Sequence, residues 1–276
     1  MPPEPTLLVT DLDGTLLTSE KTVSPATLVA LSEVRAAGIR LAIASARPYR
    51  LIESVVPQTV LELFAAVIVS NGAAVIRPGD RAVLREDPLE PADTGQVIAA
   101  LRAEWPSAGF GWESGREFSS DRAFLQLTRD GGILRDPHPD RVIGRPDEPV
   151  HQLVMAVPDA APRTLLRRVA ELAGPEFAVT DSLGGVVEIS PASVSKATAA
   201  AWWAHSHGAG LADVIAFGDE HNDLPLLTAA GTSVAMGNAS AEVRAAATTT
   251  TLTNDQDGVA VALRRLLADL RNRSDA

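Results

Sequence analysis

The stretch Thr6-Leu-Leu-Val-Thr-Asp-Leu-Asp-Gly-Thr-Leu16 decides the fold, because it joins a short strand to a polar loop. Residues 6–10 are apolar or β-branched, which is typical of a buried strand. The strand ends at two carboxylates, Asp11 and Asp13, and Gly14 then allows a tight turn. Ligands of open α/β sheets bind beyond the carboxyl ends of the strands. The stretch therefore predicts a functional loop at the edge of a parallel sheet.

The segments on both sides of this loop alternate between helix and strand patterns. Ser24 and Pro25 fit an N-cap followed by proline at the first helical position, and Gly38 fits the end of that helix. Further strands are expected at 40–44, 65–70, 214–217 and 233–235, with helices at 48–56, 196–208, 224–230 and 258–271. Strands and helices that alternate with short links indicate a parallel α/β sheet.

The pattern changes between residues 81 and 188, which are richer in proline, glycine and charged side chains. Half-exposed strands alternate there with helices near 92–104 and 162–173. We therefore expect the fold class α/β, with a Rossmann-like parallel-sheet core from residues 1–80 and 189–276. Residues 81–188 are expected to form an inserted α+β cap domain.

Composition limits the classes of partner. The 276 residues include 35 Asp plus Glu and 24 Lys plus Arg, a net charge of −11, which argues against nucleic-acid and membrane partners. There is no cysteine, no basic leader and no apolar run of about 20 residues, so we expect a cytoplasmic protein without disulfides. The oligomeric state cannot be read from the sequence.

Two pairs of carboxylates stand at predicted strand ends: Asp11 with Asp13, and Asp219 with Asp223. An ionised carboxylate can attack phosphorus and hold a hard cation, while a second one can carry a proton. Asp-x-Asp-Gly also occurs in turns and in calcium loops. The EF-hand alternative fails because the next ligand position lacks Asp or Asn and the twelfth lacks Glu.

A hydroxyl and an ammonium group complete the candidate site. Ser45 follows the second strand, where it could bind a phosphate oxygen or cap a helix. Lys196 opens a predicted helix, and its charge suits a phosphate or a carboxylate. A lone lysine is usually a solvated surface residue, so Lys196 gains weight only from the other motifs.

Together these motifs resemble the haloacid dehalogenase superfamily, and specifically its Cof-like branch (subfamily IIB), which carries a large C2-type cap after the third strand. The motifs occur in order along nearly the whole chain: Asp11-Leu-Asp-Gly-Thr15, Ser45 with Arg47-Pro48, Ser70-Asn-Gly-Ala73, Lys196, Gly218-Asp-Glu-His-Asn-Asp223, Val234-Ala-Met-Gly-Asn-Ala239 and Asp257-Gly-Val259.

The resemblance implies a Mg²⁺-dependent phosphatase that hydrolyses small phosphorylated metabolites, such as sugar phosphates, through an aspartyl-phosphate. It implies that Asp11 is the nucleophile and a metal ligand. Asp13 would bind the metal through its backbone carbonyl and act as general acid and then general base. Asp219 would complete the protein ligands of the metal.

The remaining implied roles concern the phosphate and the substrate. Ser45, Lys196 and Asn222 would bind the phosphoryl group. Asp223 would contact the ligands of the metal without binding the metal itself, or it would orient Lys196. Arg47 and Asn71 would lie on the substrate side.

The chain departs from the family pattern at three positions. Ser45 and Ala46 replace the usual threonine and glycine of Thr-Gly-Arg, and the serine keeps the hydroxyl. Ser193 replaces the glycine that usually precedes the Ser-Lys pair. Two other functions stay open. A phosphotransferase or phosphosugar mutase uses the same Asp pair, and a non-catalytic protein could bind phosphate or metal without turnover.

Overall fold

The computed structural model describes residues 6–114, 117–131, 139–158, 162–181 and 186–274. The first five residues, on which the expectation of no leader partly rests, lie outside the described residues. The chain divides into two compact units. The core unit contains Met1–Arg85 and Ser195–Ala276, and the cap unit contains Glu86–Val194.

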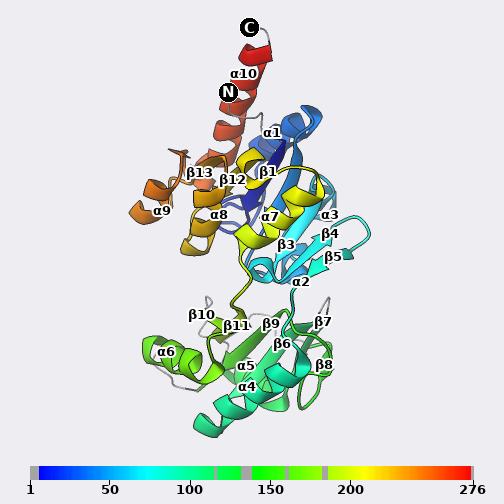
Figure 1. Ribbon diagram of the computed structural model, residues 1–276, viewed down its shortest axis with the longest axis vertical. Coiled ribbons are helices and arrows are strands. Elements are labelled where there is room, and N and C mark those ends of the chain that lie inside the picture. Colours follow the sequence, from blue (N-terminus) through cyan, green and yellow to red (C-terminus); the bar gives the residue numbers. More distant parts are fainter. Residues whose placement is uncertain (1–5, 115–116, 132–138, 159–161, 182–185, 275–276) are drawn as a thin grey trace. The chain divides into compact units, whose positions relative to one another are not determined.

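The core unit is built on an eight-stranded sheet in the order β14-β13-β12-β1-β2-β3-β4-β5 (Figure 1). Neighbouring strands from β14 to β3 are parallel, and β4 is antiparallel to β3. The strands are β1 (Leu7–Asp11), β2 (Arg40–Ala44), β3 (Ala66–Val69), β4 (Ala74–Arg77), β5 (Ala82–Glu86), β12 (Val214–Gly218), β13 (Thr232–Ala235) and β14 (Thr249–Thr250).

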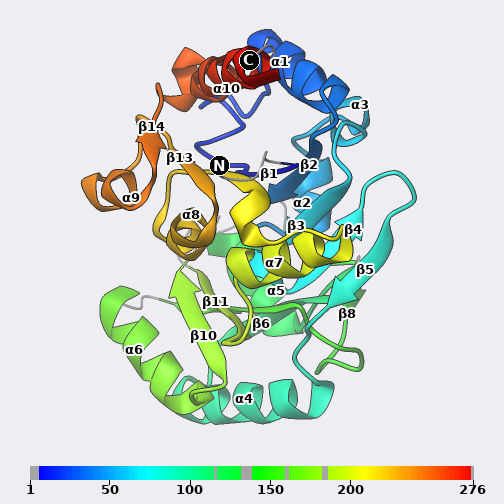
Figure 2. The same ribbon diagram turned by 45° about the horizontal axis from the view of Figure 1, so that its top comes forward.

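Helices cover both faces of this sheet, with α1 and α10 packed together on one face and α7 and α8 on the other (Figure 2). Alternate residues of β1 therefore enter two hydrophobic clusters, Leu8 in one and Leu7 and Val9 in the other. Burial on both faces explains the unbroken apolar strand sequences. The core helices are α1 (Pro25–Ala36), α2 (Tyr49–Glu53), α3 (Gln58–Leu61), α7 (Lys196–Ser206), α8 (Leu224–Ala229), α9 (Ala241–Ala246) and α10 (Gly258–Ser274).

The strand order places a topological switch at β1. The chain passes from β1 to β2 and β3 on one side, and after the cap unit it returns to β12 on the other side. The carboxyl ends of β1 and β12 therefore lie side by side, with Thr10 opposite Phe217. Ligands of open α/β sheets bind at such a point.

The cap unit has its own six-stranded sheet, in the order β10-β11-β9-β6-β7-β8. Its hydrophobic core is separate from that of the core unit and contains Phe110, Trp112 and Met155. The cap elements are α4 (Pro91–Glu104), β6 (Gly109–Ser114), β7 (Glu117–Ser120), α5 (Arg122–Gly131), β8 (Arg141–Val142), β9 (Gln152–Ala156), α6 (Pro162–Ala173), β10 (Phe177–Asp181) and β11 (Val186–Pro191).

The structure confirms the expected α/β fold class with a parallel-sheet core, and it places some elements differently. The helix expected at 48–56 is shorter, since α2 ends at Glu53. Pro57 has no N–H to continue the helical hydrogen bonding and instead precedes a second short helix, α3. Residues 81–85 were expected in the insertion, yet β5 extends the core sheet. Residues 189–194 were expected in the core, yet β11 belongs to the cap sheet and the division falls before Ser195.

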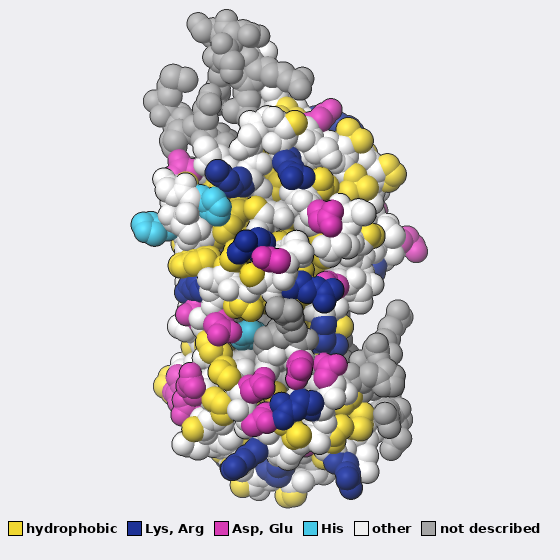
Figure 3. All heavy atoms as spheres, turned by 90° about the vertical axis from the view of Figure 1, so that its right-hand side faces the viewer, with side chains coloured by type: hydrophobic (Ala, Val, Ile, Leu, Met, Phe, Trp, Pro, Cys, Tyr) yellow, Lys and Arg dark blue, Asp and Glu magenta, His cyan; other side chains and the backbone are white. Residues whose placement is uncertain are grey.

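None of the helices in the described part of the chain is both long and apolar enough to cross a bilayer. On the face drawn in Figure 3, Lys and Arg side chains are interspersed with Asp and Glu.

Candidate active site

The candidate site begins where β1 and β12 end. Asp11 is the last residue of β1, and Asp219 directly follows Gly218, the last residue of β12. Because β1 and β12 are parallel neighbours, both carboxylates stand at the same sheet edge. Asp223 reaches the same place from the turn before α8.

Lys196 joins two of these carboxylates. It is the first residue of α7, and its side chain is 1% exposed. Its Nζ donates to Asp11 Oδ1 at 2.5 Å and to Asp223 Oδ1 at 2.7 Å. The second carboxylate oxygen of Asp223 accepts from the backbone N–H groups of Asp219 and Glu220. Asp223 therefore fixes both the lysine and the loop that carries Asp219.

Asp219 is held from two sides by residues to which the sequence analysis gave no role. Thr15 Oγ1 donates to Asp219 Oδ1 at 2.8 Å, and Asn238 Nδ2 donates to Oδ2 at 3.0 Å. Asn238 Nδ2 also donates to the carbonyl oxygen of Gly14 at 2.9 Å, which ties the two loops together. Gly14 has φ +74°, and a Cβ there would lie 2.2 Å from Asp219 Oδ2, so this position requires glycine.

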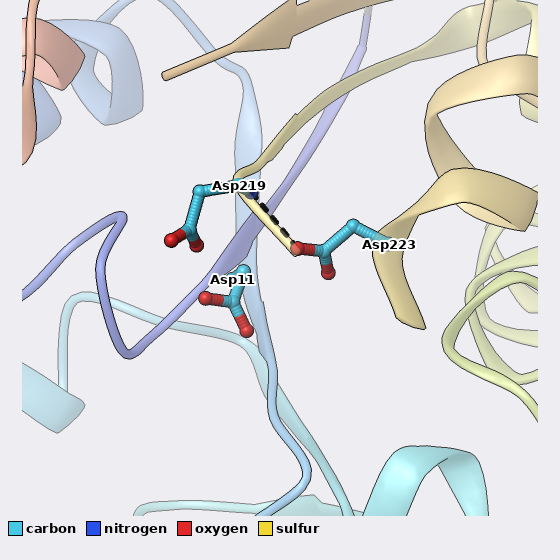
Figure 4. A group of neighbouring side chains, drawn as sticks. All are labelled: Asp11, Asp219 and Asp223. Carbon is cyan, nitrogen blue, oxygen red and sulfur yellow. Dashed lines mark hydrogen bonds between the residues drawn. The ribbon is translucent and has the colours of Figure 1, made fainter. Parts of the chain in front are cut away.

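The carboxylates of Asp11, Asp219 and Asp223 converge on one point (Figure 4), each offering one oxygen within 4.8 Å of the others. If ionised, three carboxylates and the Lys196 ammonium carry a net charge of −3 + 1 = −2. Carboxylate oxygens are hard donors, which Mg²⁺ prefers. Both the donor chemistry and the excess charge fit a divalent cation held by Asp11 and Asp219.

The crowding of these groups changes their protonation equilibria. Burial raises the pKa of Asp11 well above its ordinary value, and the nearby Asp223 and Asp219 raise it further against the lowering effect of Lys196. Burial also raises the pKa of Asp219 to about 6, despite the hydrogen bond from Thr15. Burial alone would lower the pKa of Lys196, but Asp11 and Asp223 raise it, so the ammonium stays charged.

Asp13 lies in a different environment. Its carboxylate accepts a two-bond fork from Arg47, with Nε at 2.5 Å and a terminal nitrogen at 2.7 Å, and Lys21 Nζ donates at 2.8 Å. Burial acts to raise the pKa of Asp13, but the hydrogen bonds from Arg47 and Lys21 outweigh it and lower the pKa. Arg47, predicted to lie on the substrate side, thus pairs with Asp13, as does Lys21, for which the sequence predicts no role.

The predicted phosphate-binding residues occupy neighbouring loops. Ser45 is buried directly after β2, and its Oγ accepts from the backbone N–H of Arg47 at 3.1 Å. Asn222 Nδ2 donates to Asn71 Oδ1 at 2.9 Å, which brings these two predicted residues together. Ala46 and Ser193 do not have positive φ, so neither position demands the glycine usual in the family.

The profile of the haloacid dehalogenase-like hydrolase family matches residues 8–263. The chain is 30% identical over 275 residues to the 5-amino-6-(5-phospho-D-ribitylamino)uracil phosphatase of Bacillus subtilis, covering 94% of this chain and 97% of that protein. It is 27% identical over 270 residues to the pyridoxal phosphate phosphatase of Escherichia coli, covering 92% of this chain and 96% of that protein.

A solved structure shows the same likeness in three dimensions. A haloacid dehalogenase-like hydrolase from Bacteroides thetaiotaomicron superposes with a TM-score of 0.78 and 26% sequence identity, covering 95% of this chain and 100% of that chain. The coverage means that residues of both units take part in the likeness.

Proposed function

The chain belongs to the haloacid dehalogenase-like hydrolases, and we propose that it is a Mg²⁺-dependent phosphatase that hydrolyses small phosphorylated metabolites through a phosphoryl group on Asp11. One observation carries the proposal: Asp11, Lys196, Asp219 and Asp223 converge at the switch point of the core sheet. The two relatives are named for a phosphorylated ribitylaminouracil and for pyridoxal phosphate, which supports the substrate class.

In the first step, Asp11 attacks the phosphorus atom of the monoester. The bond between phosphorus and the ester oxygen breaks as the Asp11–phosphorus bond forms, and the leaving oxygen takes a proton from Asp13 to become an alcohol. Arg47 and Lys21 hold Asp13 as a carboxylate in this structure. The substrate must therefore displace part of this pairing before Asp13 can carry the proton.

In the second step, water attacks the phosphorus atom and gives its proton to Asp13, and the acyl phosphate bond breaks. Inorganic phosphate leaves, and Asp11 returns as a carboxylate. Lys196 and Ser45 stabilise charge on the phosphoryl oxygens through both steps, where positioning and electrostatics supply most of the catalysis. Asp11, Asp219 and the Asp13 carbonyl would hold Mg²⁺, which would offset charge on the same oxygens.

The test is phosphate release from a panel of phosphorylated metabolites that includes sugar phosphates and pyridoxal phosphate. We expect inorganic phosphate to appear with Mg²⁺ and to be suppressed by EDTA, and the Asp11→Asn variant to release none. An isomerised sugar phosphate without free phosphate would instead identify a mutase. Binding of panel compounds in saturating Mg²⁺ with no turnover would identify a non-catalytic binding protein.

A further inference from the structure

The loop Ser70-Asn71-Gly72, which follows β3, has an unusual backbone. Its three residues have consecutive φ values of +48°, +58° and +113°. Ser70 Oγ is buried and has no hydrogen-bond partner among the described residues. Left-handed non-glycine residues and unpaired buried hydroxyls are costly, and they persist only where the surroundings enforce them.

Two backbone hydrogen bonds attach this loop to the loop that carries Ser45 and Arg47. The Ser70 N–H donates to the Arg47 carbonyl at 3.0 Å, and the Asn71 N–H donates to the Ser45 carbonyl at 3.0 Å. The loop's two non-glycine residues with positive φ are therefore the same two whose N–H groups bind the segment with the predicted phosphate-binding residue Ser45.

The other side of the loop meets the beginning of α7. A Cβ on Gly72 would lie 2.3 Å from the carbonyl oxygen of Ser195, the residue before Lys196. Only glycine allows the backbone of α7 to approach so closely. On the same loop, Asn71 Oδ1 accepts the amide of Asn222 at 2.9 Å.

We propose that Ser70-Asn71-Gly72 is a positioning loop, which sets Lys196 and Asn222 in register with Ser45 around the phosphoryl group. The assignment rests on the proposed function for the identity of that group. Ser45, Lys196 and Asn222 belong to three separate segments of the core unit, after β2, at the start of α7 and before α8. The loop contacts each of these segments. A displacement of about 1 Å at such groups can lower turnover about 10²-fold.

The decisive comparison is between Gly72→Ala and Gly208→Ala. Gly208 also has a positive φ, +73°, and lies just beyond the other end of α7, where a Cβ would meet nothing within 4 Å. Gly208→Ala therefore places alanine at a positive φ, as Gly72→Ala does, but without a clash against α7. We expect both variants to lose thermal stability. Only Gly72→Ala should lose about 10²-fold in kcat/KM for p-nitrophenyl phosphate and bind inorganic phosphate more weakly as an inhibitor. Equal kinetic constants in the two folded variants would overturn the proposal.

Two further measurements keep the proposal testable if Gly72→Ala does not fold or if the wild type proves inactive. Asn71→Gly keeps the left-handed backbone and removes the acceptor of Asn222, so its effect on kcat/KM should not add to that of Asn222→Ala. Additive effects would contradict the loop's action on Asn222. If the wild type has no turnover, crystal structures of the folded variants decide. Asn222 must shift in Asn71→Gly, and Lys196 must shift relative to Asp11 in Gly72→Ala, while both residues must keep their positions in Gly208→Ala. Unchanged positions in the folded loop variants would overturn the proposal.

Discussion

Burial and the carboxylates of Asp223 and Asp219 raise the pKa of Asp11, while Lys196 lowers it and favours the ionised form. The protein therefore maintains a charge that chemistry needs and that the folded state disfavours. Such arrangements are typical of sites in which activity is gained at the expense of stability.

Asp11→Asn removes the proposed nucleophile and one of the three converging carboxylates. We expect turnover to fall to background, because the neutral amide cannot attack phosphorus. The melting temperature without metal should equal or exceed that of the wild type, since Asp223 still pairs with Lys196. Phosphate release and thermal unfolding on the same samples test both parts. Retention of a tenth of wild-type activity, with deamidation excluded by mass spectrometry, would place the chemistry elsewhere.

Asp13→Ala should act on proton transfer. We expect a loss of roughly 10²–10⁴-fold in the first step for alkyl phosphates, and a smaller loss for aryl phosphates, whose leaving groups need less protonation. Single-turnover measurements of both substrate types separate this step from hydrolysis of the intermediate. Equal losses for the two types would contradict the acid role of Asp13.

At the residue scale, the sequence predicts the functional groups that follow a strand end. It does not predict the residues that hydrogen-bond to those groups and hold them in place. Asp11, Asp219 and Lys196 stand at the ends or starts of recognisable elements, so their convergence could be anticipated. The contacts of Asn238 depend on how separate loops approach each other, and that of Lys21 with Asp13 depends on how the connection between β1 and α1 folds back on itself. No residue spacing encodes either arrangement.

At the element scale, β1 and β12 act together because they are parallel neighbours with matched register. Their alternation with helices was predictable because apolar strand runs and capping residues such as Ser24 are local signals. The addition of β4 and β5 to the edge of the core sheet was not predictable, because it depends on pairing between segments and not on a local signal.

The junction of these two strands should govern metal dependence. Asp219→Ala removes the proposed metal ligand that follows β12, so the Mg²⁺ concentration for half-maximal activity should rise steeply. Titration of activity with Mg²⁺ after EDTA treatment measures the change. Thr15→Val, which removes only the hydrogen bond to Asp219, should cause a smaller shift in the same direction. Full activity of metal-stripped wild-type protein would refute this role.

The same junction predicts a pH dependence of stability. The folded pKa of Asp219, about 6, exceeds its ordinary value of 3.8. Between about pH 4 and 6 this carboxyl therefore binds more protons in the folded protein than in the unfolded chain, and its contribution to the free energy of unfolding falls as pH rises. Mg²⁺ binds the ionised carboxylate, so it should raise the melting temperature more at pH 7.5 than at pH 5. An equal gain at both pH values would contradict this, and Asp219→Asn should reduce the difference.

At the scale of the whole molecule, the chain is two units with separate hydrophobic cores, and each residue to which we assign a chemical role belongs to the core unit. We therefore expect the cap unit to select the substrate and to limit access of water, while the core unit carries the chemistry. Beside the insertion, a terminal guanidinium nitrogen of Arg85 donates to the carbonyl oxygen of Thr198 at 3.2 Å, so the end of β5 contacts α7 within the core unit.

The test replaces residues 86–194 by a Gly/Ser linker between the two segments of the core unit. The shortened protein should fold, since β5 and α7 keep their contacts within the core unit. It should hydrolyse p-nitrophenyl phosphate slowly and only with Mg²⁺, and its kcat/KM values for different metabolites should converge. The measurement is the ratio of best to worst substrate in the full-length and shortened proteins, with Asp11→Asn in the shortened chain as the control for contaminating phosphatases. If the shortened protein keeps the full-length ranking and spread, specificity resides in the core unit, and the role that we assign to the cap is wrong.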